Sequence, residues 1–124
     1  MIAYPAITLL TVTADSNNGY KFSQYGNTED PTIYALAGAT IAFKINSGAN
    51  HPFQIETSGG SAYDNGLVHV ALDGTESTGS SAQGKVSGTL YWQVPANISG
   101  NYQYQCTIHS SMQGTIVVKA LSAI

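Results

Sequence analysis

Residues 100–118 read Gly-Asn-Tyr-Gln-Tyr-Gln-Cys-Thr-Ile-His-Ser-Ser-Met-Gln-Gly-Thr-Ile-Val-Val, and the interpretation of the whole chain starts from them. On an extended strand alternate side chains share a face, so Tyr102, Tyr104 and Cys106 point the same way and aim the thiol inward at the strand end. An imidazole and a thioether follow, at His109 and Met112, with two residues between successive donors. This spacing predicts a tight loop between two strands that wraps three donors around one ion.

A further donor has to come from elsewhere in the sequence. Two imidazoles and a thiolate, with a weak and long thioether contact, suit copper that alternates between two oxidation states. The best source is His51, which follows a strand-like run at 40–45 and precedes a short apolar run. His69 could replace it, but we expect His69 to lie in a turn-rich segment and to face solvent. We therefore predict that His51, Cys106, His109 and Met112 bind one copper ion.

Simpler roles exist for each of these residues alone. A single buried Cys is usually an inert small hydrophobe, and Met112 could fill an irregular gap in the core. The joint spacing favours a metal site over these separate roles. Zinc also accepts Cys and His, but structural zinc sites seldom use a thioether, so copper fits better. Tyr102 and Tyr104 could relay electrons, yet we predict that both pack in the core with their hydroxyls bonded to backbone.

Strand-like runs recur along the chain between turn signals, and most are rich in β-branched and aromatic residues. Large apolar residues alternate over 40–45 and 89–94, which places each set on one face. We see no long segment with helical periodicity. The pattern predicts an all-β fold, a Greek-key β-sandwich, with residues 1–124 forming a single domain. The predicted strands cover residues 7–13, 20–24, 40–45, 53–56, 89–94, 101–106 and 115–119.

Residues 57–88 differ from the rest, because they are turn-rich and low in apolar content. We interpret them as a loop excursion from the sandwich. A short apolar segment within them, at 67–72, fits a brief strand or a helical turn equally well and stays unassigned.

Composition excludes several classes of partner. The seven acidic residues outnumber four lysines, there is no arginine, and the formal charge is −3, so we expect no nucleic-acid binding. No apolar run approaches the ~20 residues of a membrane-spanning helix, so we expect no membrane insertion. The first residues do not resemble a signal peptide. The compartment stays open: periplasm or thylakoid lumen if a leader was removed, cytoplasm or virion otherwise.

The motif Gly-x-Tyr-x-Tyr-x-Cys-x-x-His, followed by Met, Gly and a Val-rich strand, resembles the C-terminal ligand loop of the cupredoxins. Within that family it is most similar to plastocyanin and amicyanin, and the two-residue gap between His109 and Met112 is more similar to amicyanin. The resemblance implies that His51, Cys106 and His109 are the strong ligands of a type 1 (blue) copper site and Met112 the axial one. Residues 57–88 are outside the resemblance.

One position departs from the family pattern. The residue after the upstream His is usually Asn, whose backbone N–H donates to the copper thiolate, but here it is Pro52, which has no N–H. Fewer donors leave more charge on sulfur and favour the oxidised ion. We predict a lower reduction potential than a Pro52→Asn variant would have. Thr107 loses the partner that this Asn usually gives it, and Asn50 is the alternative we expect.

The resemblance implies a soluble one-electron carrier that is a monomer and meets redox partner proteins at a small, weakly charged surface around His109. Nothing in the sequence suggests hydrolytic or acid–base catalysis, and a fully ligated copper has no position for substrate, so we predict that the chain is not an enzyme. A second hypothesis is a copper-binding or structural module of a larger assembly, such as a virus particle. A third, a fragment of a multicopper enzyme, requires more histidines than the three present.

Overall fold

The protein is described by a computed structural model, in which residues 4–120 are placed well enough to describe. Its regular secondary structure is strand, apart from two short 3₁₀ turns, η1 (Ser23–Tyr25) and η2 (Gly79–Ala82). The strands are β1 (Thr8–Ala14), β2 (Tyr20–Phe22), β3 (Ile33–Leu36), β4 (Thr40–Asn46), β5 (Phe53–Thr57), β6 (Leu67–Val70), β7 (Glu76–Thr78), β8 (Thr89–Gln93), β9 (Gly100–Cys106) and β10 (Gln113–Lys119).

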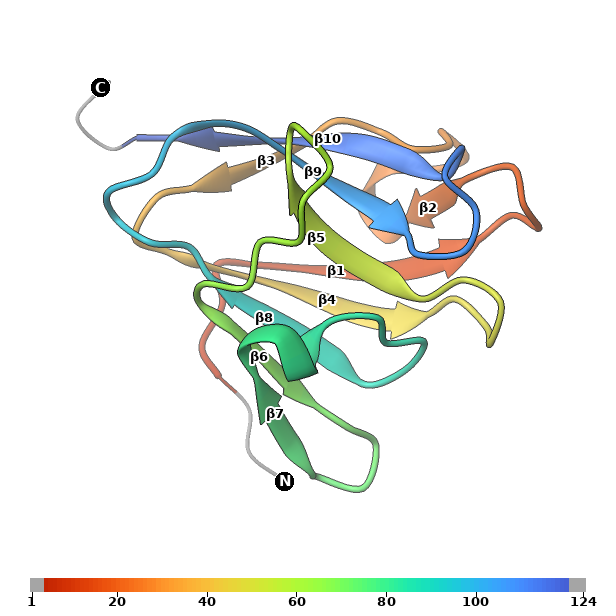
Figure 1. The fold of residues 1–124 in the computed structure, drawn as a ribbon, viewed down its shortest axis with the longest axis horizontal. Helices are drawn as coiled ribbons and strands as arrows, with labels where there is room; N and C mark the ends of the chain where they lie inside the picture. The colour runs from red at the N-terminus through yellow and green to blue at the C-terminus, as the bar shows by residue number, and fades with distance from the viewer. Residues whose placement is uncertain (1–3, 121–124) are drawn as a thin grey trace.

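The strands form two sheets that face each other (Figure 1). One sheet has six strands in the order β2-β1-β4-β8-β6-β7, and the other has four in the order β3-β10-β9-β5. Most neighbours are antiparallel, whereas β1 runs parallel to β4 and β3 runs parallel to β10. Because the chain crosses repeatedly between the sheets, the predicted all-β Greek-key sandwich is confirmed.

The core lies between the sheets and is built from the alternating residues that the sequence predicts. Ile41, Phe43 and Ile45 of β4 are buried, as are Leu90 and Trp92 of β8. The antiparallel register pairs Ile41 with Trp92 and Phe43 with Leu90, so the two inward rows lie side by side. These paired rows anchor the six-stranded sheet, and the connection that carries His51 begins at the end of its strand β4.

The interpretation of residues 57–88 as a loop excursion is wrong in part. The unassigned segment contains β6, which pairs with β8, and β7 extends the same sheet by pairing with β6. Within 57–88, the residues that connect β5, β6, β7 and η2 form loops. A further strand, β3, was not predicted, although it pairs with β10 along its whole length.

The prediction that His69 faces solvent is also wrong. His69 lies on β6, opposite Leu90 of β8, and is only 3% exposed. Its Nε2 lies 2.7 Å from the Ser87 carbonyl oxygen, while its Nδ1 has no hydrogen-bond partner. Alternation along β6 turns this side chain inward, on the same face as Leu90. Among residues 4–120 there is no helix of the length and apolar character needed to span a membrane.

Candidate metal centre

The loop after β9 carries two of the predicted donors and is closed by backbone hydrogen bonds. Cys106 is the last residue of β9, and its N–H donates to the Met112 carbonyl at 2.9 Å. The Met112 N–H donates in turn to the His109 carbonyl at 3.0 Å. Since Gln105 and Gln113 are the next paired residues, the loop is the tip of the β9–β10 hairpin. The sheet therefore holds both ends of the loop.

His51 reaches the same end of the sandwich from the connection between β4 and β5. Its N–H donates to the Gly48 carbonyl at 3.0 Å, within a turn where Gly48 has a φ of 86°. Its own carbonyl accepts the Ser47 hydroxyl at 2.7 Å. β5 pairs with β9, and their register sets Phe53 opposite Cys106. Pairing between strands far apart in sequence therefore brings His51 to the loop of Cys106 and His109.

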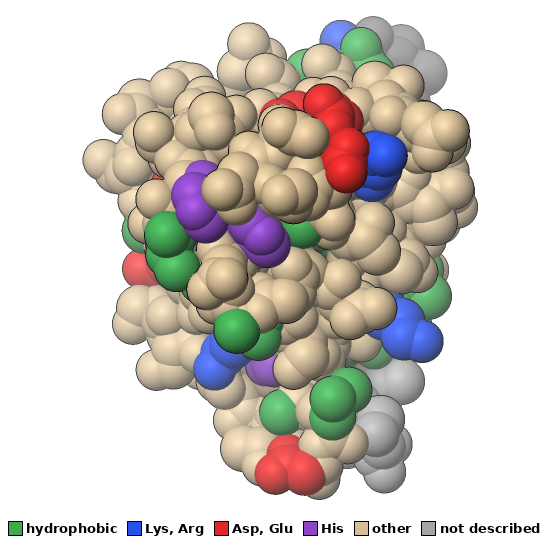
Figure 2. Space-filling view, turned by 90° about the vertical axis from the view of Figure 1, so that its right-hand side faces the viewer, with side chains coloured by type: hydrophobic (Ala, Val, Ile, Leu, Met, Phe, Trp, Pro, Cys, Tyr) green, Lys and Arg blue, Asp and Glu red, His purple; other side chains and the backbone are tan. Residues whose placement is uncertain are grey.

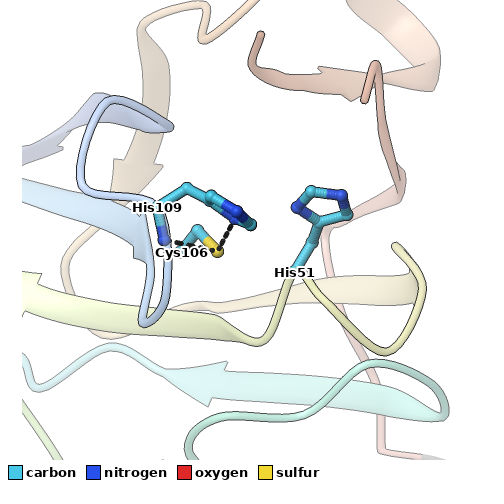
Figure 3. Close-up of side chains that lie close together, drawn as sticks. All are labelled: His51, Cys106 and His109. Atoms are coloured by element: carbon cyan, nitrogen blue, oxygen red, sulfur yellow. Dashed lines mark hydrogen bonds between the residues drawn. The ribbon is translucent and has the colours of Figure 1, made fainter. Parts of the chain in front are cut away.

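The structure brings His51, Cys106 and His109 together as one cluster (Figure 3). One potential ligand atom from each lies within 4.8 Å of the others. Cys106 Sγ is 3.7 Å from His109 Nδ1, and the two imidazole rings have centroids 5.1 Å apart. His51 Nδ1 is shielded from solvent and has no hydrogen-bond partner among residues 4–120. An unpartnered buried nitrogen facing a thiol and a second imidazole is the arrangement that a bound cation would satisfy.

The sulfur atom of Cys106 has a sparse hydrogen-bond environment. It accepts the backbone N–H of His109 at 3.3 Å and lies 3.6 Å from the Asn50 carbonyl oxygen. Pro52 contributes no N–H, and its carbonyl accepts the Thr107 N–H at 3.1 Å. The expected bond between the side chains of Thr107 and Asn50 is absent within residues 4–120. Within the same range, the His109 amide is therefore the one backbone donor to this sulfur.

Met112 is fully buried at the end of the same loop. Burial agrees with an axial ligand and with a core residue alike, so its ligation stays a prediction. Tyr104 is fully buried and donates its hydroxyl to the Pro31 carbonyl at 2.6 Å, as predicted. Tyr102 packs against Tyr63, with ring centroids 4.9 Å apart, but within residues 4–120 its hydroxyl lacks the predicted backbone partner.

The cluster lies just beneath the surface at one end of the molecule. His51 and His109 are half-buried, whereas Cys106 is fully buried. Figure 2 shows histidine side chains side by side on this end, with apolar groups next to them. Ile108 is 58% exposed beside them. The two loops at this end, 48–52 and 107–111, contain no Asp, Glu, Lys or Arg.

Two side chains outside the motif also belong to this end of the fold, and the sequence analysis missed them. Ser47 and Tyr20 both direct hydroxyl groups to the His51 carbonyl, at 2.7 and 2.8 Å. Tyr20 comes from β2, thirty-one positions before His51. No local pattern connects Tyr20 with His51, so only the folded arrangement reveals this contact.

Comparison with solved structures identifies the architecture. A reduced rusticyanin structure superposes with a TM-score of 0.54 at 22% identity, covering 94% of this chain and 82% of that one. The chain has the cupredoxin fold. Rusticyanin from Thiobacillus ferrooxidans gives a TM-score of 0.53 at 19% identity, covering 94% of this chain and 80% of that one. Auracyanin B gives 0.51 at 15% identity, covering 95% and 93%. No protein-family model matches the sequence, and no curated protein matches it significantly.

Proposed function

We propose that this cupredoxin domain binds one copper ion through His51, Cys106 and His109, with Met112 as the axial ligand, and that it carries single electrons between redox proteins. The observation that carries the proposal is the His-Cys-His cluster at the loop end of the sandwich. One of the structurally similar rusticyanins is described as a copper protein. Two imidazoles and one thiolate are the donor set that type 1 copper prefers.

The residues present fit this group. The thiol of Cys106 provides a thiolate once its proton is released, and the unpartnered Nδ1 of His51 is a free imidazole donor. A closed zinc tetrahedron would need a fourth strong donor, and the remaining donor of this loop is a thioether. Copper supplies the one-electron chemistry when bound, because it is stable in two oxidation states.

The chain itself would hold the ligands still. Hydrogen bonds from Cys106 to Met112 and from Met112 to His109 close one ligand loop, and Ser47 and Tyr20 fix the carbonyl of His51. The buried side chains beneath the cluster keep water away from the sulfur. Ligands that stay in place need little rearrangement on electron transfer, which favours a carrier.

The surface at this end supports brief encounters with partner proteins. Ile108 is exposed beside the histidines, and the loops 48–52 and 107–111 have no charged residues. A small, weakly charged contact area suits transient redox complexes, which bury less surface than stable complexes. Four donors around one ion leave no position for a substrate, which supports a carrier over an enzyme.

The decisive experiment is a visible and EPR spectrum of the purified protein after addition of cupric ion. We expect an intense thiolate-to-copper band with narrow copper hyperfine splitting. Cys106→Ser should abolish the band, whereas the matched control Ser111→Ala, an exposed position in the same loop, should keep it. A protein that stays colourless with cupric ion would contradict the proposal.

A copper-binding or structural module of a larger assembly would share these spectra. Voltammetry distinguishes the electron carrier from the module, because a carrier gives a reversible one-electron wave without loss of metal. A blue protein with an irreversible wave would favour the module.

A further inference from the structure

Tyr20 places a buried hydroxyl at the candidate metal centre. It is fully buried, and its ring contacts Phe53 and Tyr104 edge-on, with centroids 5.3 and 6.1 Å away. A phenylalanine would fill the same space. Burying a hydroxyl group costs free energy unless it is hydrogen-bonded, so this hydroxyl requires a partner. Its partners are the backbone carbonyls of His51 and Pro52, at 2.8 and 3.1 Å.

Both carbonyls would remain hydrogen-bonded without Tyr20. The His51 carbonyl also accepts the Ser47 hydroxyl at 2.7 Å, and the Pro52 carbonyl accepts the Thr107 N–H at 3.1 Å. Satisfying a stranded acceptor is therefore not the role of the Tyr20 hydroxyl. What it adds is a link from β2, in the six-stranded sheet, to the segment that carries the imidazole.

The segment has few other links to the rest of the fold. The His51 N–H is used within its own turn, on the Gly48 carbonyl, and Pro52 has no N–H at all. Residues 51 and 52 are consequently held through their carbonyls. Removing one of the donors to these carbonyls should therefore leave residues 51 and 52 less firmly held.

We propose that Tyr20 is a positioning residue, whose hydroxyl holds the His51–Pro52 segment so that the His51 imidazole faces Cys106 and His109. The inference rests on the proposed metal site and extends it to a residue outside the ligand loops.

The test compares Tyr20→Phe with Tyr104→Phe. Both tyrosines are fully buried in one aromatic cluster, and each variant removes one hydroxyl. The Tyr104 hydroxyl donates to the Pro31 carbonyl, whereas the Tyr20 hydroxyl donates to the carbonyls of His51 and Pro52. Tyr104→Phe takes that donor from a carbonyl, so it should destabilise the fold at least as much as Tyr20→Phe. Any effect through general destabilisation would then appear in both variants.

Two measurements are made on each variant. The first is the NMR spectrum of the His51 ring in the metal-free protein, and the second is the dissociation constant for cobaltous ion. We expect Tyr20→Phe to broaden or split the His51 ring signals and to weaken cobaltous binding roughly 2- to 10-fold, the equivalent of one hydrogen bond. Tyr104→Phe should leave both readings at wild-type values.

Equal behaviour of the two variants, or wild-type behaviour of Tyr20→Phe, would overturn the assignment. If Tyr20→Phe does not fold, Ser47→Ala leaves Tyr20 as the remaining hydroxyl donor to the same carbonyl, so the His51 signals should stay sharp. Broadened signals would show that the Tyr20 hydroxyl does not hold the segment and would refute the idea. Failure of the wild-type protein to bind any metal would instead refute the proposed function. The His51 signals of the metal-free protein would still report on positioning.

Discussion

Pro52 removes one hydrogen-bond donor from the surroundings of Cys106. Within residues 4–120, the sulfur accepts a single backbone N–H, from His109 at 3.3 Å. Phe53 pairs with Cys106 and the Thr107 N–H donates to the Pro52 carbonyl, so residue 52 adjoins the segment that carries the sulfur, yet as a proline it has no N–H to donate. Hydrogen bonds to the ligand sulfur stabilise its negative charge, which is greater in the reduced state. Pro52→Asn should therefore raise the reduction potential.

The size of the rise follows from the strength of one such bond. A hydrogen bond to a charged group contributes about 1.5–3 kcal/mol, and both oxidation states keep the thiolate, so only about 1 kcal/mol separates them. For a one-electron couple a tenfold change in the equilibrium corresponds to about 59 mV and about 1.4 kcal/mol. The expected rise is therefore roughly 40 mV.

Cyclic voltammetry of the copper-loaded protein measures this shift. Pro52→Ala is the matched control, because it restores the backbone N–H without adding the Asn side chain. Both variants should rise by a similar amount. An unchanged potential in both would refute the account of the sulfur environment. A rise in Pro52→Asn alone would assign the effect to the side chain instead of the amide.

Three further predictions concern the axial position and the interior. Met112→Leu keeps the buried volume, so the free energy of unfolding should change by less than about 1.5 kcal/mol. The EPR spectrum of the copper-loaded variant should differ from that of the wild type. An identical spectrum would make Met112 a core residue only. Burial lowers the pKa of His69, so the unfolded chain takes up its proton at a higher pH than the folded chain. The free energy of unfolding should then fall as pH drops below about 6.5, by up to about 1.4 kcal/mol per pH unit, and urea titrations of His69→Gln should lack that part of the slope. Gly88→Ala would set a Cβ 2.6 Å from the Val70 carbonyl at a φ of 76°, whereas Gly84→Ala has a φ of 69° and open space. Gly88→Ala should lower the urea midpoint more, since only it adds a backbone clash to the cost of the left-handed conformation, and equal losses would contradict this reasoning.

The sequence was sufficient wherever local alternation and donor spacing decide the structure. Tyr102, Tyr104 and Cys106 lie on one strand face as predicted, and Cys106 and His109 approach each other within a closed loop. His51 joined the cluster because β5 pairs with β9, a long-range contact that the sandwich topology makes available. A short motif and a fold class were together enough to predict these three residues.

Other features depend on contacts that no local pattern contains. The three residues of β7, Glu76–Thr78, have no apolar alternation, and they form a strand because β6 offers an unpaired edge. The burial of His69 follows from the pairing of β6 with β8, which sets the inward face of a segment too short to reveal its period. Tyr20 shows the same limit, since its contact with His51 exists only in the folded chain.

The surroundings of Pro52 separate two properties of the candidate metal centre, namely the hydrogen bonding of the Cys106 sulfur and the orientation of the His51 imidazole. A backbone N–H at this position would both fix the turn and donate to the sulfur. Here the turn is fixed through carbonyls instead: Ser47 and Tyr20 donate to residue 51, and Thr107 donates to residue 52. In the part of the chain that the structure describes, the sulfur accepts one backbone N–H, that of His109 in its own loop. We therefore expect the donors to sulfur to set the reduction potential of bound copper, and the hydroxyls of Ser47 and Tyr20 to set the orientation of the His51 imidazole. Substitutions of Pro52 should act mainly on the reduction potential of bound copper, and substitutions of Tyr20 mainly on the affinity for the metal.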